Sequence, residues 1–340
     1  MAPIAPVDAA VAQDNLVIPL IDFSLFLHGT PRDKAQAAHT ILAGFQTAGF
    51  IYLKNHGIPT ESVSRTFAES AKFFARPAEQ KDALAWTTPE SNRGYVTHGR
   101  EKVTQLGDKD AVEKLRARNP DLKESLEIGR EGEEGHPNNW PDGYDEEGKV
   151  FKKVMLGFFE QCKDLHMQVM QAIALALGLH ENYFDTYTDG GDNTLRLLHY
   201  PAVHKSAFVK NQGQVRAGEH SDYGSITLLF QDMRGGLQVK SPKGTYVNAT
   251  PIPDTIVINA GDLLARWSND TIKSTLHRVI EPPTPPETDE YPARYSIAYF
   301  CNPNFDKFID VIPGTDEKEP KKYSGINSGQ YLVQRLAATY

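Results

Sequence analysis

The chain has 340 residues, enough for one large domain or two small ones, and either can bury a core without disulfide staples. Charged residues make up 24% of the sequence and hydrophobic residues 40%, which is typical of a soluble globular protein and excludes a disordered or fibrous chain. The formal net charge of -8 argues against a nucleic-acid polymer as the main partner.

The two cysteines, Cys162 and Cys301, lie far apart and have no CxxC spacing. We therefore expect neither a disulfide framework nor a cysteine zinc site, and a reducing compartment fits the sequence. The N-terminus has no basic segment followed by a long apolar run, and no stretch approaches the roughly 18 apolar residues that a membrane-spanning helix needs. These features predict a cytoplasmic protein with no membrane partner and no evident obligate protein partner.

The first part of the chain is expected to hold helices and a few strands. Thr30 followed by Pro31 is typical of a helix start, and the apolar spacing after it predicts a helix that ends near Gly49. Residues 50–53 are expected to form a buried strand, and a second amphipathic helix is expected to stop before Pro77.

The middle of the chain changes character twice. Residues 87–147 are polar and rich in glycine, proline and charge, which indicates long loops and short helices. An apolar stripe then runs from Phe151 to Ile173 at helical spacing, and Gly178 is well placed to end this longest helix. We expect this helix to be the spine against which a sheet packs.

From residue 194 onward the sequence has the pattern of short strands. Strands are expected at residues 194–200, 225–230, 236–240, 245–249, 255–259, 275–280 and 294–300. Many short strands separated by turn residues favour a closed or double-layered antiparallel sheet such as a jelly roll. A closing helix is expected around Leu332 and Leu336.

A His-x-Asp pair stands just before the strand expected at residues 225–230. In an extended chain, residues i and i+2 point to the same side, so His220 and Asp222 converge. His277 lies inside another predicted strand and could supply a third ligand from a neighbouring position in the sheet. Two histidines and a carboxylate on one face leave three coordination positions open, as non-haem Fe(II) oxygenases require, because cosubstrate and O2 must both reach the metal.

Arg294 and Ser296 lie two residues apart in the last predicted strand and therefore point the same way. Arginine presents a planar fork of donors that matches a carboxylate, and serine adds a hydroxyl. A dicarboxylate that chelates iron at one end needs such an anchor at the other. A lone His-x-Asp pair or a lone Arg-x-Ser pair is more often structural, but their order here, with a histidine between them, indicates iron used together with a dicarboxylate.

Motifs along nearly the whole chain match those of one family. They are residues 18–22 (IPLID), 48–52 (AGFIY), 55–57 (NHG), 73–77 (FFARP), 92–95 (NRGY), 220–222 (HSD), 259–262 (NAGD), 274–279 (STLHRV) and 294–296 (RYS). On these residues the chain resembles the isopenicillin-N-synthase-like branch of the 2-oxoglutarate/Fe(II)-dependent dioxygenases.

The resemblance implies a mainly β fold with flanking helices. Its core would be a double-stranded β-helix, or jelly roll, with an N-terminal helical portion and a long spine helix. Residues 1–147 would form the N-terminal helix and strand portion. Residues 148–340 would form the spine helix and the catalytic core, and the two parts would make one integrated catalytic unit.

The resemblance also implies that the three predicted ligands hold Fe(II), that Arg294 and Ser296 bind 2-oxoglutarate, and that O2 is the oxidant, with ascorbate as a candidate reductant. One position departs from the family pattern. Many relatives have Asn-Tyr-Tyr-Pro before the first metal ligand, whereas residues 198–201 here read Leu-His-Tyr-Pro. Tyr200 keeps the position associated with cosubstrate binding, but Leu198 replaces the asparagine and leaves open how the 1-carboxylate of 2-oxoglutarate is hydrogen-bonded.

Four longer segments carry a closer resemblance. They are residues 191–201 (GDNTLRLLHYP), 213–220 (GQVRAGEH), 264–270 (LARWSND) and 331–340 (YLVQRLAATY). They are similar to the fungal thymine-7-hydroxylases, which oxidise the methyl group of thymine stepwise to an alcohol, an aldehyde and a carboxylate. This implies that Asn193 and Arg196 hydrogen-bond a pyrimidine and that Tyr223 and Phe300 stack on it, roles that suit their donors, acceptors and rings.

Other interpretations stay open at this point. Arg196 could pair with an acidic neighbour, and Phe300 could belong to the core. The small planar substrate could be thymine or another 5-substituted pyrimidine, or an aromatic polyketide, because fungal relatives oxidise such methyl groups on similar scaffolds. The chain could also be an iron oxidase that does without 2-oxoglutarate, or a ligand-sensing relative without activity. Zinc hydrolysis is disfavoured, because no HExxH helix accompanies the site.

Overall fold

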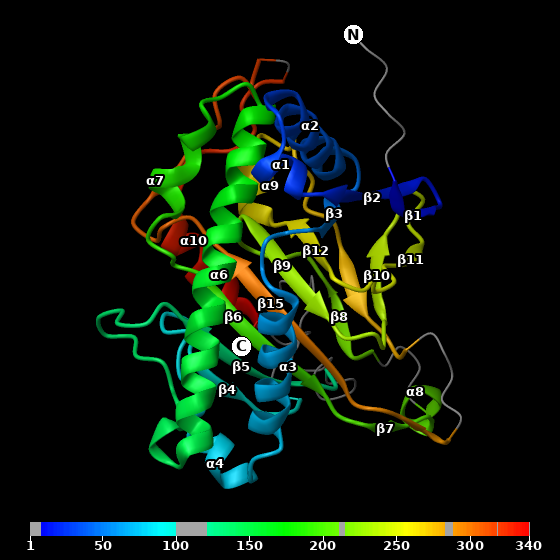
Figure 1. The fold of residues 1–340 in the computed structure, drawn as a ribbon, viewed down its shortest axis with the longest axis vertical. Coiled ribbons are helices and arrows are strands. Elements are labelled where there is room, and N and C mark those ends of the chain that lie inside the picture. Colours follow the sequence, from blue (N-terminus) through cyan, green and yellow to red (C-terminus); the bar gives the residue numbers. More distant parts are fainter. Residues whose placement is uncertain (1–7, 100–120, 211–214, 283–287, 318, 340) are drawn as a thin grey trace.

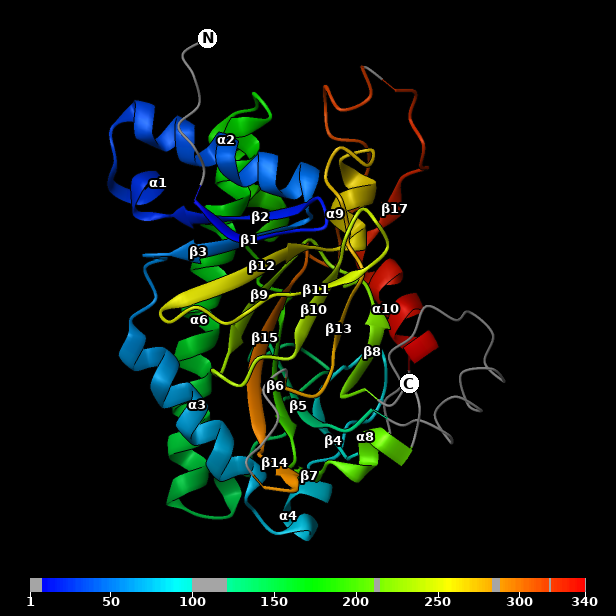
Figure 2. The ribbon, with the colours of Figure 1, turned by 90° about the vertical axis from the view of Figure 1, so that its right-hand side faces the viewer.

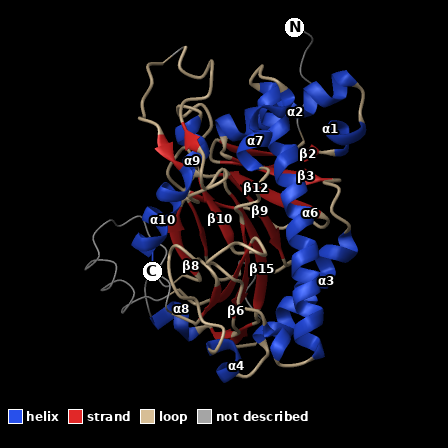
Figure 3. Ribbon diagram, turned by 90° about the vertical axis from the view of Figure 1, so that its left-hand side faces the viewer, coloured by secondary structure: helices blue, strands red, loops and turns tan. Residues whose placement is uncertain are grey.

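The structure is a computed structural model that describes residues 8–99, 121–210, 215–282, 288–317 and 319–339 (Figure 1). Two β-sheets face each other, and helices cover the outer side of the larger one (Figure 2, Figure 3). This is a jelly-roll core with flanking helices, the expected fold class. In the part of the chain that the structure describes, no helix has both the length and the apolar character needed to cross a bilayer.

The larger sheet has nine strands, and most neighbours in it are antiparallel. In spatial order they are β1 (Ala9–Gln13), β2 (Leu16–Asp22), β3 (Phe50–Lys54), β12 (Thr255–Ala260), β9 (Ile226–Gln231), β15 (Arg294–Cys301), β6 (Thr194–Tyr200), β5 (Glu124–Gly129) and β4 (Gly94–Val96). Strands from residues 1–147 and from residues 148–340 therefore share hydrogen bonds within one sheet.

The smaller sheet has four strands, and two further pairs of short strands lie outside both sheets. The smaller sheet runs β11 (Tyr246–Asn248), β10 (Leu237–Lys240), β13 (His277–Val279) and β8 (Ala217–His220). The short pairs are β14 (Glu290–Tyr291) with β7 (Val203–His204), and β16 (Phe308–Ile309) with β17 (Ile326–Asn327).

Most of the helical residues pack on the large sheet from outside the jelly roll (Figure 1, Figure 3). The longer helices are α2 (Pro31–Thr47), α3 (Thr60–Phe74), α6 (Glu146–Ala176) and α10 (Ser328–Thr339). The shorter ones are α1 (Ser24–His28), α4 (Ala78–Asp82), α7 (Asp185–Thr188), α8 (Ser206–Lys210) and α9 (Asp262–Trp267), with 3-10 turns at Pro141–Gly143 and Glu181–Phe184. The 31-residue α6 is the expected spine, and α10 is the expected closing helix.

Local sequence signals fix the ends of the two longest helices. The Thr30 hydroxyl accepts a hydrogen bond from the Asp33 N–H, and the Asp33 carboxylate accepts one from the Thr30 N–H, so a capping box with Pro31 in the first turn starts α2. The side chain of Asp145 accepts from the Gly148 N–H and caps α6, and Gly178, with a φ of 77°, follows its last turn. Both predicted helices are confirmed.

All seven strands predicted between residues 194 and 300 are present, with ends shifted by at most two residues. The prediction of loops and short helices for residues 87–147 is wrong in part, because β4 and β5 lie there and β5 is buried along its whole length. The prediction missed β5 because this strand contains two carboxylates. Glu124 pairs with Lys81 and His199, and Glu127 pairs with an arginine of β6, so charges that suggested an exposed loop are buried in ion pairs.

Alternation along the central strands separates two buried faces. Leu195 and Leu197 of β6 point toward the helices, and Leu198 and Tyr200 of the same strand point into the space between the two sheets. Alternate residues of a strand therefore face the inside of the jelly roll, and the residues between them face the helices. The two central strands that line the cavity described below contribute every second residue to it.

Candidate active site

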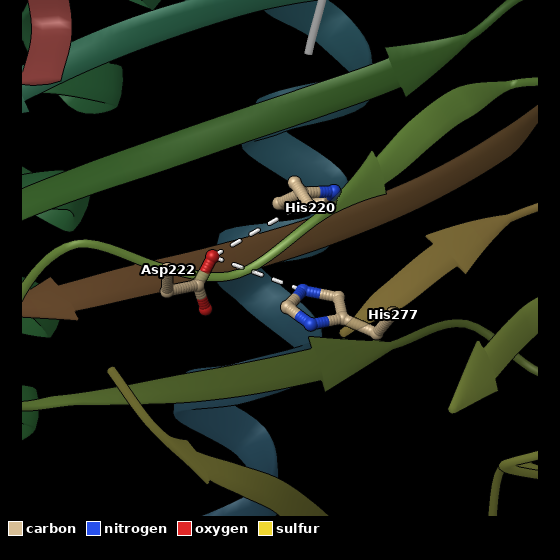
Figure 4. A group of neighbouring side chains, drawn as sticks. All are labelled: His220, Asp222 and His277. Atoms are coloured by element: carbon tan, nitrogen blue, oxygen red, sulfur yellow. Dashed lines mark ion pairs between the residues drawn. The ribbon is translucent and has the colours of Figure 1, made fainter. Parts of the chain in front are cut away.

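The residues predicted to bind metal converge between the two sheets (Figure 4). His220 ends β8 and lies directly opposite His277 of β13 in the antiparallel ladder, and Asp222 follows two residues after β8. Asp222 Oδ1 lies 3.8 Å from His220 Nε2 and 3.7 Å from His277 Nε2. The three potential ligand atoms lie within 4.8 Å of one another, so side chains far apart in sequence form one donor cluster.

Hydrogen bonds orient both imidazoles toward the shared centre. His220 Nδ1 lies 2.8 Å from the carbonyl oxygen of Gly218, and His277 Nδ1 lies 3.2 Å from that of Thr275. Since a carbonyl only accepts, each Nδ1 carries the proton, and each Nε2 presents a lone pair.

Two hydrogen bonds to one oxygen hold the carboxylate of Asp222 in place. Its Oδ2 accepts hydrogen bonds from Thr227 Oγ1 at 2.6 Å and from Asn259 Nδ2 at 2.7 Å. Oδ1, the oxygen nearest the two imidazoles, is thereby turned toward the cluster. Buried partners of this kind fix ligand geometry in metal sites.

The electrostatics of the cluster suit a divalent cation. Burial, together with the charge of His277, lowers the pKa of His220 to about 3, so its imidazole is neutral at neutral pH. Burial alone would raise the pKa of Asp222, but the two histidines, Thr227 and Asn259 outweigh it and lower that pKa. Metal ligands must be deprotonated, and the neutral imidazole of His220 and the ionised carboxylate of Asp222 meet that requirement. The donor set therefore fits Fe(II) with open coordination positions.

The cluster opens into a cavity of about 110 Å³ between the sheets. Two central strands line it with alternate residues: Thr194, Arg196, Leu198 and Tyr200 of β6, and Arg294, Ser296, Ala298 and Phe300 of β15. In the ladder that joins these strands, Tyr200 lies opposite Arg294, and Leu198 lies opposite Ser296.

One end of the cavity carries the predicted dicarboxylate anchor. Arg294 is 1% exposed, and its Nη1 donates to Ser296 Oγ at 3.2 Å. Its Nε donates to the carbonyl of Gly235 at 2.8 Å, and its guanidinium carbon lies 4.8 Å from the centre of the Tyr200 ring. The guanidinium is thus held rigidly while it faces the cavity. Leu198 presents an apolar side chain beside this end.

The other end carries three of the four residues predicted to bind substrate. Arg196, Tyr223 and Phe300 all line the cavity. Arg196 Nε lies 2.7 Å from the nearer oxygen of Glu127, and its guanidinium carbon lies 4.9 Å from the centre of the Phe300 ring. Arg196 therefore does pair with an acidic neighbour, as the alternative interpretation held, and it faces the cavity as well.

Asn193 is not among the residues that line the cavity. It precedes Thr194 by one residue, so strand alternation turns it to the other side, where its Nδ2 donates to Tyr299 Oη at 3.0 Å. Its Oδ1 accepts from the backbone N–H of Asn302 at 2.9 Å. The structure thus does not bring Asn193 together with the other predicted substrate residues.

Several cavity residues were missed in the sequence. Asn92 and Lys123 come from the N-terminal portion, and Leu332 and Leu336 come from α10. Asn92 belongs to the NRGY motif, which signalled the family but gave no role to this position. Trp86 Nε1 donates to Asn92 Oδ1 at 3.1 Å, which fixes the orientation of the amide.

Two family descriptions match the chain. Residues 18–143 match the N-terminal region of non-haem dioxygenases in morphine synthesis, and residues 191–303 match the 2OG-Fe(II) oxygenase superfamily. The chain belongs to this oxygenase superfamily. It is 35% identical to the 2-oxoglutarate-Fe(II) type oxidoreductase ppzD of Metarhizium rileyi, covering 94% of this chain and 90% of that one. It is 34% identical to the proline hydroxylase buaE of Petromyces alliaceus, covering 94% and 98%.

Solved structures of one fungal protein are more similar to this oxygenase. The full-length thymine-7-hydroxylase of Neurospora crassa in complex with alpha-KG matches with a TM-score of 0.91 and 61% identity, covering 98% of this chain and 100% of that one. The complex of the same hydroxylase with alpha-KG and thymine matches with a TM-score of 0.91 and 63% identity, over the same shares. The oxygenase is thus a 2-oxoglutarate-dependent non-haem iron dioxygenase, and the expected family, the enzyme class and the use of Fe(II) and 2-oxoglutarate are confirmed, while ascorbate stays a prediction.

Proposed function

We propose that this oxygenase oxidises, in successive steps, the methyl group of thymine or of another 5-substituted pyrimidine. The observation that carries the proposal is a cavity in which Tyr223, Phe300 and Arg196 stand beside the His-Asp-His cluster. The similarity to the Neurospora crassa thymine-7-hydroxylase, a protein solved with thymine bound, supports the same substrate class. A cytoplasmic location stays a prediction.

We propose that His220, Asp222 and His277 hold the ferrous ion. When bound, the iron with 2-oxoglutarate and O2 supplies the oxidising chemistry, and succinate and CO2 are released. The chain itself orients the three ligands. The carbonyls of Gly218 and Thr275 accept hydrogen bonds from the two imidazoles. Thr227 and Asn259 donate hydrogen bonds to the carboxylate. The apolar residues of the cavity exclude water from the reacting C–H bond.

Arg294 and Ser296 are proposed to bind the distal carboxylate of 2-oxoglutarate. Both face the cavity, and the guanidinium is fixed by the carbonyl of Gly235, so little side-chain freedom is lost when the carboxylate binds. Tyr200 packs against the guanidinium and shapes this end of the site. With Leu198 in the place of an amide, the 1-carboxylate would depend on the metal and on other cavity donors.

At the substrate end, Tyr223 and Phe300 would sandwich the planar base, and Arg196 would donate to a ring carbonyl. Glu127 holds the Arg196 guanidinium at 2.7 Å and so fixes its direction. The amide of Asn92 accepts from Trp86 and donates to Thr194 Oγ1 at 3.3 Å, and its second N–H would donate to the pyrimidine edge, a role like the one first predicted for Asn193. Because Tyr223 directly follows Asp222, a base stacked on it would lie near the metal.

A substrate panel scored for both succinate and oxidised product tests the proposal. Thymine, 5-hydroxymethyluracil and 5-formyluracil should each be turned over, with about one succinate for each oxidation step. Uracil, which has no methyl group, is the matched control and should give no hydroxylated product. Turnover of a methylated aromatic polyketide or of proline, with none of thymine, would contradict the proposal and favour another substrate class.

A further inference from the structure

Arg216 is a buried cation that the site described so far does not use. It precedes β8, its backbone N–H donates to the carbonyl of Val279 at 2.8 Å, and its side chain has no exposure to solvent. The guanidinium Nη2 donates to the carbonyl of Pro292 at 3.3 Å. Nε and Nη1 are buried and have no hydrogen-bond partner among the described residues. Buried polar nitrogens are almost always paired, so this arrangement requires an explanation.

Arg216 stands close to the cosubstrate end of the cavity. Its guanidinium carbon lies 5.9 Å from the centre of the Tyr200 ring, the same ring that Arg294 contacts at 4.8 Å. The next residue, Ala217, lines the cavity, as does Val279. Arg216 itself is not among the lining residues, so it stands behind Tyr200 rather than in contact with the cavity.

Two arginines, Arg216 and Arg294, thus share one buried region, and neither forms an ion pair within 4.0 Å with any carboxylate that the structure describes. Burial, together with the charge of Arg294, lowers the pKa of Arg216 to about 10. Asp232 and Glu281 act in the opposite direction, but neither forms an ion pair with Arg216 in the described part of the chain. Two buried positive charges repel each other, and an anion bound between or beside them offsets that repulsion.

We propose that Arg216 is a positioning residue for 2-oxoglutarate, which strengthens binding of its distal carboxylate through the buried charge beside Arg294. Arg216 acts in two ways. Its positive charge adds to the electrostatic potential at this end of the cavity, and its side chain packs against Tyr200. It therefore favours 2-oxo acids with a second carboxylate over those with one. The inference rests on the proposed role of Arg294 and Ser296.

The test is anaerobic binding to the iron-loaded protein, followed by the visible charge-transfer absorption that appears when a 2-oxo acid chelates the metal. Two ligands are compared: 2-oxoglutarate, and 2-oxopentanoate, in which a methyl group replaces the distal carboxylate. For Arg216→Met and Arg216→Gln, we expect the Kd of 2-oxoglutarate to rise about tenfold or more and that of 2-oxopentanoate to stay within about twofold. Arg216→Lys keeps the charge and should retain most of the preference for 2-oxoglutarate.

Lys240→Met is the matched control, because it removes one positive charge from the same small sheet, where Lys240 pairs with Glu219. It should leave both Kd values unchanged. Melting temperatures show which variants are folded. Because two neutral substitutions are measured, the test can still be made if one of them misfolds. An unchanged ratio of the two Kd values in a folded neutral variant, or an equal loss for both ligands, overturns the proposal. If Arg294→Met also leaves 2-oxoglutarate binding unchanged, the proposed anchor itself fails, which is a separate result.

Discussion

Asp222 depends on two buried donors for its orientation and charge, and removing one of them gives a quantitative test. Thr227→Val deletes the 2.6 Å hydrogen bond to Asp222 Oδ2 and changes the shape of the side chain very little. A hydrogen bond to a charged group contributes about 1.5–3 kcal/mol, so the ionised carboxylate loses about that much support. We expect affinity for Fe(II) to fall about 10- to 100-fold, the range found when a partner of a metal ligand is removed.

The assay is competition between the protein and a chelator for Fe(II), under anaerobic conditions and over a series of pH values. The pKa of Asp222 is held low partly by the Thr227 hydroxyl, so the variant should lose metal at a higher pH than the wild type when acid is added. Ser225→Ala is the control, because it also removes a buried hydroxyl. That hydroxyl donates to the Cys301 carbonyl and lies near His166, whereas the Thr227 hydroxyl donates to Asp222. Wild-type affinity in folded Thr227→Val, or an equal loss in Ser225→Ala, would refute the reasoning.

Three further predictions follow from other parts of the structure. Phe300→Leu should raise the KM for thymine about 5- to 150-fold, equivalent to about 1–3 kcal/mol of lost stacking, without changing the KM for 2-oxoglutarate; equal changes in both would contradict this. Burial opposes ionisation of Glu124, but hydrogen bonds from His199 and Lys81 lower its pKa from 4.5 to about 2. The ionised Glu124 carboxylate therefore stabilises the fold above about pH 4.5, and this contribution is lost as the pH falls toward 2. In Glu124→Gln, the free energy of unfolding should fall less steeply with acid than in the wild type. Leu336→Ala opens the cavity wall that α10 supplies and should raise the ratio of succinate to oxidised product; an unchanged ratio would argue against a role in positioning.

Only part of the metal cluster was predictable from geometry local to one segment. His220 and Asp222 converge through the two-residue repeat of an extended chain. His277 was predicted from its place in a second expected strand, and its position opposite His220 depends on the pairing of β13 with β8. The same repeat placed Arg294 and Ser296 on one face. Periodicity and turn residues also predicted the strands between residues 194 and 300, since these strands are apolar enough to stand out from their connections.

Residues that depend on long-range pairing could not be found in this way. β5 was missed because Glu124 and Glu127 look like residues of an exposed loop, whereas their partners lie far along the chain. Glu124 pairs with Lys81 and His199, and Glu127 pairs with Arg196. Sequence pattern alone cannot show that a carboxylate is buried in an ion pair.

Sequence pattern also failed to place single residues at the substrate end of the cavity. Asn193 and Thr194 are neighbours, and only the observed register shows that Thr194 faces the cavity while Asn193 faces away. Asn92 reaches the cavity from a different part of the chain, beside β4 of the large sheet, a placement that no spacing within residues 191–303 could reveal.

A crystal structure of the protein with Mn(II), 2-oxoglutarate and thymine would test the account most directly. We predict one metal ion bound by His220 Nε2, Asp222 Oδ1 and His277 Nε2, with the base lying between Tyr223 and Phe300. A metal ion held by other residues, or one of these three side chains turned away from the ion, would contradict the central claim.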